Sequence, residues 1–320
     1  MDANRDTKSE QLPPSSTLLA YVQLFRMPNV FTAMADVLMG YLFVRPSLDP
    51  PQYSALLLLG SALMYTAGMV LNDVFDVEVD RTERPERPLP SGRIAVGWAR
   101  WLGFEMLFAG AALGVLVGVI ARDPRPAVAA VLLAALIVLY NRVLKATFFG
   151  PMAMGGCRFL NVLLGMSVAT EAWSGVNYLI AAGIGVFIVG VSWFARGEAE
   201  DDIHRGPLIA GTILMAFGIL LLASYPNGRL AGSKDIVAVF HQYPENLAWL
   251  LLSITILFRC IRAIVQPYSV FVQEAVKYCL MSLITFDTII TFVQHDIWWA
   301  ALVFALVVPM TLLGRWSYST

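Results

Sequence analysis

The sequence predicts an all-α fold, a polytopic membrane helical bundle with nine to ten transmembrane helices. Hydrophobic residues make up 58% of the 320 residues and charged residues only 14%, a balance typical of integral membrane proteins. Apolar segments of about the length that crosses a bilayer follow one another along the chain. They lie near 30–46, 53–75, 95–120, 124–141, 149–170, 174–195, 206–224, 244–265, 270–292 and 296–314.

The N-terminal segment 1–16 differs from the rest of the chain. It is polar, charged and rich in Pro and Ser, and it contains no apolar core of a signal peptide, so we expect a disordered cytoplasmic tail. No linker-like stretch separates the spans that follow. Residues 17–320 are therefore predicted to form a single transmembrane domain.

Lys and Arg residues are distributed unevenly between the two sides of the predicted bundle. Arg81, Arg84 and Arg87 belong to the richer side, together with the N-terminus and the loop after the sixth span. The positive-inside rule places that side in the cytoplasm. We expect a protein of the cytoplasmic (inner) membrane whose site opens to the cytoplasm.

Some functional classes are disfavoured by composition. The three cysteines lie in apolar segments without a CxxC spacing, which argues against a disulfide framework or a zinc site. The three histidines show no spacing typical of metal ligands. A net charge of −1 gives no indication of nucleic-acid binding.

The segment NDVFDVEVD at 72–80 ends the second span and carries the strongest chemical signal. On one continuous helix Asp73, Asp76 and Asp80 fall at i, i+3 and i+7, so their carboxylates share a face and suit a hard divalent cation. The arginines that follow, including Arg87, suit phosphate oxygens, because a guanidinium donates paired hydrogen bonds. The pattern predicts a Mg²⁺-diphosphate site at the membrane surface.

A second acidic cluster, FARGEAEDD, closes the sixth span on the same predicted side. Glu198 and Asp202 are four residues apart and would share a helix face, which predicts a second cation site opposite the first. The alternative is that these acids are ordinary solvated charge after a span.

Together these motifs resemble the UbiA superfamily of intramembrane prenyltransferases over about residues 20–292. The resemblance assigns Asn72, Asp73, Asp76 and Asp80 to the first metal motif and Arg87 to the turn after it. It also implies that Lys145, and Arg142 beside it in LYNRVLK, contact the diphosphate. The second motif departs from the usual DxxxD, since Glu198 stands first. The family commonly has nine spans, so 296–314 would be an added tenth.

Polar residues within the spans are candidates for binding the second substrate. Asn29 and Asp36 share a face of the first span, and Arg158 and Asn161 share a face of the fifth. Ionisable groups at membrane depth are costly unless they face a polar cavity or a partner. The alternative is that Asp36 and Arg158 pair with each other to hold helices together. Asp287 lies deep in a later span and has no explanation from the sequence.

RMPNVFTAMADVLMG, CRFLNVLLG and AVKYCLMSLITFD are more narrowly similar to the EboC-like branch of the family. That similarity implies a cyclitol-type acceptor in place of an aromatic ring. The resemblance as a whole implies Mg²⁺-dependent transfer of a prenyl group from an allylic prenyl diphosphate to a small polar acceptor within the lipid bilayer. Two other classes stay open, a polytopic secondary transporter and a non-catalytic binding subunit with the same fold.

Overall fold

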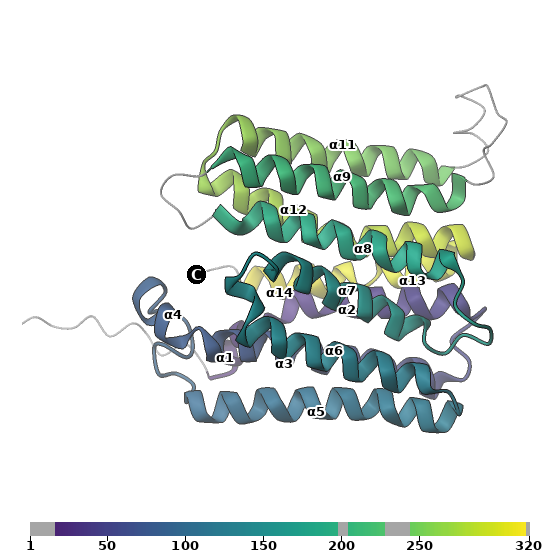
Figure 1. The fold of residues 1–320 in the computed structure, drawn as a ribbon, viewed down its shortest axis with the longest axis horizontal. Helices are drawn as coiled ribbons and strands as arrows, with labels where there is room; N and C mark the ends of the chain where they lie inside the picture. Colours follow the sequence, from purple (N-terminus) through teal and green to yellow (C-terminus); the bar gives the residue numbers. More distant parts are fainter. Residues whose placement is uncertain (1–16, 198–203, 228–243, 318–320) are drawn as a thin grey trace, which may run out of the picture.

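The structure is a computed structural model that describes residues 17–197, 204–227 and 244–317. Its regular structure is helical (Figure 1). The elements are α1 (Thr17–Leu24), α2 (Met27–Val44), α3 (Pro51–Phe75), α4 (Val77–Glu83), α5 (Val96–Ala121), α6 (Pro124–Arg142), η1 (Leu144–Ala146), α7 (Gly150–Met166), α8 (Gly175–Phe194), η2 (Ala195–Gly197), α9 (Arg205–Asn227), α11 (Pro244–Val265), α12 (Ser269–Gln294), α13 (Ile297–Phe304) and α14 (Val307–Ser317).

The predicted spans are confirmed, with ends that differ by only a few residues. Within the described ranges, nine helical segments are long and apolar enough to cross a membrane, and the shorter α7, of 17 residues, lies among them. The last predicted span, 296–314, is divided into α13 and α14. The chain is therefore an integral membrane protein with an all-α fold. The predicted tail, 1–16, lies outside the described residues.

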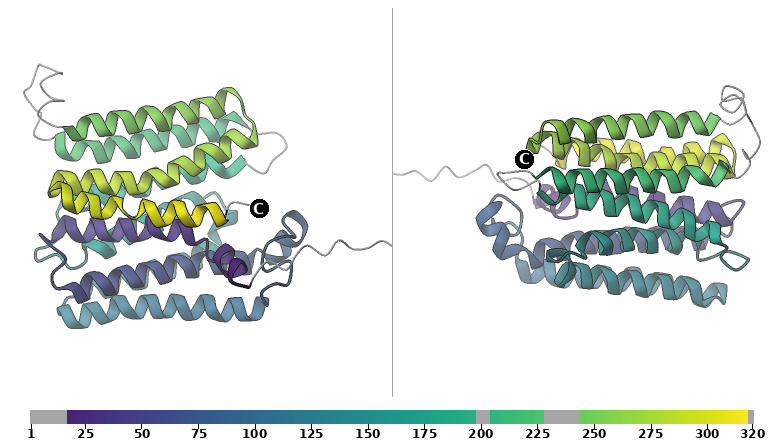
Figure 2. Two further views of the ribbon diagram at one scale, coloured as in Figure 1. Left: turned by 180° about the vertical axis from the view of Figure 1, so that it is seen from behind. Right: turned by 45° about the horizontal axis from the view of Figure 1, so that its top comes forward.

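The long helices lie side by side, with α5 at one edge of the bundle and α9 and α11 at the other (Figures 1 and 2). The helices α2, α7 and α12 lie between these edges. The central helices are more buried than those at the edges. In α2, 67% of the span is buried, but in α11 only 22% is. The exposed face of α11 is apolar, as contact with lipid requires.

Two glycines bring α2 and α7 into close contact at the centre of the bundle. A Cβ atom on Gly40 would lie 2.6 Å from the carbonyl oxygen of Val162, and one on Gly165 would meet the backbone of Val37. Only glycine allows backbones to approach so closely, which is how small residues promote helix packing in membranes. This contact fixes the positions of the polar side chains that the two helices carry.

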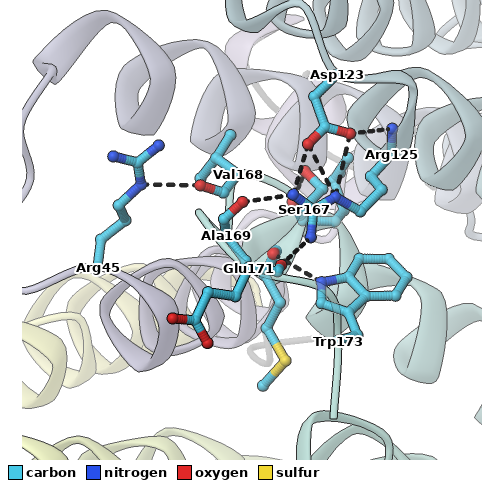
Figure 3. A network of polar contacts seen from close by, with 10 residues as sticks. Arg45, Asp123, Arg125, Ser167, Val168, Ala169, Glu171 and Trp173 are labelled. Atoms are coloured by element: carbon cyan, nitrogen blue, oxygen red, sulfur yellow. Dashed lines mark hydrogen bonds and ion pairs between the residues drawn. The ribbon is translucent and has the colours of Figure 1, made fainter.

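One end of the bundle carries α1, α4 and η1, and we call it the mouth end (Figure 1). The opposite end is joined by a polar network that connects three loops (Figure 3). Arg125 binds the carboxylate of its neighbour Asp123 at 2.5 Å, donates to the carbonyl oxygens of Ala169 and Glu171, and lies over the ring of Trp173. The α7–α8 loop is therefore attached to the start of α6.

A nearby contact attaches the same loop to the end of α2. The Nε of Arg45 donates to the carbonyl oxygen of Val168 at 2.8 Å, and the indole of Trp173 donates to Met166 at 3.0 Å (Figure 3). These side chains satisfy carbonyl groups at the last residue of α7 and just beyond it, where helical hydrogen bonds are no longer available. The far end is thus held by side-chain donors to loop carbonyls.

We expect Arg125→Gln to destabilise the far end of the bundle. The variant loses charge-assisted hydrogen bonds to carbonyl groups, each worth about 1.5–3 kcal/mol, and the contact with Trp173. The thermal unfolding temperature of the protein in detergent should fall. Arg122→Asn is the control, because Arg122 is exposed and its φ of 53° suits Asn. Equal unfolding temperatures for the two variants would contradict the role of Arg125.

The pH dependence of stability gives a second test of this network. Hydrogen bonds from Arg125 hold the pKa of Asp123 below its usual range. A lowered folded-state pKa means that the carboxylate stabilises the fold above the ordinary aspartate pKa of about 3.9 and loses this effect as the pH falls below it. Asp123→Asn keeps the helix cap and should unfold more readily than wild type at neutral pH. The difference should vanish in acid; a difference that is constant with pH would refute the assignment.

Candidate active site

The acidic segment contains a bend that the sequence did not predict. α3 ends at Phe75, Asp76 has φ −92° and ψ 0°, and α4 begins at Val77. The expectation of one unbroken helix is therefore wrong. Asp73 and Asp80 are buried, whereas 31% of the Asp76 side chain is exposed. The bend directs the three carboxylates towards different partners.

Arg87 joins two of these carboxylates. Its Nη1 lies 2.7 Å from Oδ2 of Asp80 and 3.7 Å from Oδ1 of Asp73. The same Oδ1 of Asp73 accepts a hydrogen bond of 2.9 Å from Arg26, which lies just before α2. Four charged groups from four segments thus form a network at the mouth end, and its members are 35% exposed or less.

Asp76 has a different partner, Lys145 of η1. The ammonium nitrogen lies 2.5 Å from Oδ1 of Asp76, which joins the end of α3 to the segment after α6. Two residues further on, the carbonyl oxygen of Thr147 accepts a hydrogen bond from Arg196 of η2. The chain that leads into the second acidic motif therefore lies at the same end as the first. Glu198 and Asp202 themselves lie outside the described residues.

The mouth combines oxygen donors with basic groups. Asp73, Asp76 and Asp80 supply the carboxylates that Mg²⁺ prefers, and each is paired with a basic side chain. In the described part of the chain, no three His, Cys, Asp or Glu side chains are grouped closely enough to hold a metal together. The three carboxylates lie at the same end of the bundle, with Asp73 and Asp80 joined by Arg87 and Asp76 paired with Lys145; their role as metal ligands stays a prediction.

A pocket lies deeper in the bundle, between α2, α3, α6 and α7. It is lined mainly by apolar and aromatic side chains, among them Met64, Tyr65 and Tyr140. Its polar wall is formed by Ser61, Asn141, Arg158 and Asn161. An apolar cavity with a few polar groups on one side is the usual form of a small-molecule site.

Hydrogen bonds fix this polar wall. Arg158 donates to Oδ2 of Asp36 at 2.7 Å and to the hydroxyl of Thr32 at 2.7 Å, and it lies over the ring of Tyr65. Asn161 donates to the same Asp36 oxygen at 3.2 Å. The predicted pairing of Asp36 with Arg158 is thus present, and Arg158 also lines the pocket.

One face of α3 connects the pocket to the mouth. Ser61, Tyr65 and Gly68 line the pocket, and Asn72 and Asp76 continue the same i, i+4, i+7 spacing towards the mouth end. Asn141 supports this arrangement from α6 by donating to the carbonyl oxygen of Gly68 at 3.2 Å. The pocket and the charged mouth therefore lie along one face of α3.

The other predicted site residues occupy different positions. Asn29 lies one turn before Thr32, and its carbonyl oxygen accepts a hydrogen bond from the Thr32 hydroxyl. The side-chain Oδ1 of Asn29 is buried without a described donor. Asn72 is half-buried on the α3 face. Arg142 is exposed at the end of α6, and no ion pair of Arg142 with a described acid is formed.

Sequence reasoning missed several members of the site. Arg26 was not among the predicted site residues, yet it binds Asp73. Thr32, Ser61 and Tyr65 were not singled out, although Ser61 and Tyr65 share the α3 face with Asn72. The spacing of polar residues along that face was the available signal.

The fold and the site define a helical membrane protein with a charged mouth above an internal pocket. A model of the UbiA prenyltransferase family matches residues 33–269, and the chain belongs to this family. The branch within the family stays a prediction.

Individual relatives support this membership. Digeranylgeranylglyceryl phosphate synthase from Ignicoccus hospitalis is 33% identical over 162 residues, which are 50% of this chain and 50% of that protein. The protein of the same name from Saccharolobus solfataricus is 33% identical over 159 residues, 49% of this chain and 55% of that protein. The chain thus spans about half the length of the curated relatives it matches.

Solved structures show the same fold. A UbiA homologue from Archaeoglobus fulgidus bound to DMAPP and Mg²⁺ is similar with a TM-score of 0.55 and 16% identity, over 83% of this chain and 99% of that one. The apo UbiA homologue from Aeropyrum pernix K1 has a TM-score of 0.60 and 16% identity, over 82% and 96%. The predicted UbiA-like helical bundle is therefore confirmed.

Proposed function

We propose that this protein is an intramembrane prenyltransferase that moves a prenyl group from an allylic prenyl diphosphate to a polar acceptor. The observation that carries the proposal is the shared face of α3, which joins the carboxylates and basic groups of the mouth to the apolar pocket. Family membership supports the reaction type. The homologue bound to DMAPP and Mg²⁺ supports the class of donor and the metal.

The mouth suits a diphosphate that arrives with a cation. Three carboxylates and three basic side chains pair there, so their formal charges cancel. When a divalent cation binds Asp73, Asp76 and Asp80, the basic groups Arg26, Arg87 and Lys145 become available for phosphate oxygens. The proposal is that metal and diphosphate bind together and replace these internal ion pairs.

The donor chemistry of the mouth fits Mg²⁺. Carboxylate oxygens of Asp73, Asp76 and Asp80 are the ligand type that this ion uses, together with substrate phosphates and water. When bound, Mg²⁺ supplies positive charge that stabilises the departing diphosphate. Glu198 and Asp202 remain the predicted residues for a second ion.

The pocket is suited to protect and stabilise the allylic cation that forms as the C–O bond of the prenyl diphosphate breaks. Its apolar lining excludes water, which would otherwise capture the allylic cation. Tyr65 and Tyr140 line the pocket, and aromatic rings can attract positive charge. Arg26, Arg87 and Lys145 hold the leaving diphosphate at the mouth, so the two products separate towards opposite ends of the site.

The polar wall is the proposed place for the acceptor. Arg158 can donate hydrogen bonds to its oxygens. Asn161 uses both of its amide hydrogens on Ala33 and Asp36, so it supports the wall, as do Asp36 and Asn29 from α2. The names of the relatives favour a glyceryl phosphate type of acceptor. The EboC-like motifs favour a cyclitol, and an aromatic ring is the third choice. A panel with one acceptor of each class decides between them.

The mouth is proposed to open to the cytoplasm, because the arginines of the α3–α5 connection lie there. Labelling of Glu78→Cys in intact cells tests this side, since Glu78 is exposed on α4. A transporter would instead show vectorial solute uptake without release of diphosphate. A binding subunit with this fold would bind prenyl diphosphate without turnover.

Asp76→Asn should reduce prenyl transfer by about 10²–10³-fold, the size expected when a group that stabilises developing charge is removed. The readout is incorporation of labelled farnesyl or geranylgeranyl groups by purified protein with Mg²⁺, and EDTA should abolish it. Glu78→Gln is the matched control, because Glu78 lies two residues away and pairs only with Arg81 among the described side chains. Full activity of Asp76→Asn would exclude the proposed site.

Gly68 allows the pocket to be blocked without changing the mouth. A Cβ on Gly68 meets nothing closer than Ile137, at 3.4 Å, so Gly68→Ala should fold and retain activity. Gly68→Leu places a side chain within the pocket and should lower activity roughly tenfold or more, as expected when a filled site must distort to bind. Wild-type turnover by a folded Gly68→Leu variant would show that the prenyl group binds elsewhere.

A further inference from the structure

Asp287 of α12 has an environment that its charge does not explain. The residue is fully buried, and neither of its carboxyl oxygens has a hydrogen-bond donor among the described residues. An ionised carboxylate without partners at membrane depth costs several kcal/mol. The charged groups that act on Asp287 are Asp36 of α2 and Arg158 of α7.

Asp36 offers Asp287 an acceptor. Its Oδ2 accepts from Arg158 and Asn161, whereas its Oδ1 is buried without a described donor. α12 packs against α2, and Asp36 and Asp287 act on each other electrostatically across this contact. Two carboxylates have no hydrogen to share, but a protonated carboxyl is a donor. One proton on Asp287 therefore supplies the donor that Asp36 lacks.

We propose that Asp287 is a positioning residue that stays protonated, donates to Asp36 and thereby holds Arg158 at the polar wall of the pocket. The three residues then carry one positive and one negative charge and are neutral together. Carboxyl pairs that share a proton occur because two adjacent like charges are unfavourable. The unit links the C-terminal half of the bundle, through α12, to the pocket in the N-terminal half.

The arrangement selects the chemistry of the ligand. The hydrogen bonds of Arg158 to Asp36 and Thr32 use only part of its guanidinium donors, and the side chain lines the pocket. A guanidinium donates but does not accept, so its ligand presents oxygen acceptors such as a phosphate, a carboxylate or a hydroxyl oxygen. This part rests on the proposed function, with these oxygens belonging to the prenyl acceptor.

The proton itself is tested without substrate. The infrared difference spectrum between wild type and Asp287→Asn at neutral pH should contain the C=O stretch of a protonated carboxylic acid from wild type. Asn can also donate a hydrogen bond to Asp36, so Asp287→Asn should keep the unfolding temperature near that of wild type. Absence of the acid band overturns the proposal, whether or not the protein proves to be a prenyltransferase.

The positioning role is tested by kinetics with the three variants Asp287→Asn, Asp287→Ala and Asp36→Asn. Loss of a hydrogen bond to a charged group corresponds to roughly tenfold. Asp287→Ala should therefore raise the KM for the acceptor about tenfold and change the KM for prenyl diphosphate by less than about twofold. Asp287→Asn should restore the wild-type KM for the acceptor. Asp36→Asn should be more damaging, since Arg158 loses its counter-charge.

Two results contradict the positioning role. If Asp287→Asn is as damaging as Asp287→Ala, the carboxyl acts in its ionised form. If Asp287→Ala raises both KM values equally, its effect is general and does not pass through Arg158. An acid band in a protein that transfers no prenyl group would refute the proposed function and leave the shared proton standing.

Discussion

The ion pair between Arg158 and Asp36 is the interaction on which the rest of this structure depends. Its atoms are 2.7 Å apart, and the Asp36 side chain is fully buried. Removal of one partner from such a pair leaves an uncompensated charge, which costs about 3–5 kcal/mol. The pair forms because Gly40 and Gly165 let α2 and α7 approach closely, and the pocket lies directly beside it. Packing and site geometry therefore have one origin.

The charged groups of the mouth are also paired with groups of opposite charge, but these pairs are less buried than Arg158 and Asp36. Asp76 and Lys145 are paired although both remain partly exposed, at 31% and 20%. The bend at Asp76 is what separates this pair from the network of Asp73, Asp80 and Arg87. Each of the three carboxylates is paired with a basic side chain. In the proposed function, a metal and an anion that bind together exchange these ion pairs for new ones.

Apolar periodicity and length were sufficient to predict the helices, since a membrane leaves the backbone few other choices. The acidic motif and Lys145 were also predictable, because their chemistry lies in short continuous segments. The bend at Asp76 was not, because NDVFDVEVD contains neither Pro nor Gly. Arg26 and Asp287 were missed as site residues for a different reason. Their partners, Asp73 and Asp36, are distant in sequence, and only the packing of the helices brings them together.

Burial decides which of these ion pairs belong to the scaffold and which can respond to a ligand. Arg158 is 8% exposed and Asp36 not at all, so water cannot replace either partner and the pair stays closed. At the mouth, Lys145 and Asp76 are 20% and 31% exposed, and ion pairs that water reaches contribute less, only about 0–1 kcal/mol when they are fully exposed. A diphosphate with a divalent cation can replace such a pair at little cost. The depth of each pair in the bundle thus separates the groups that shape the pocket from those proposed to bind the charged substrate.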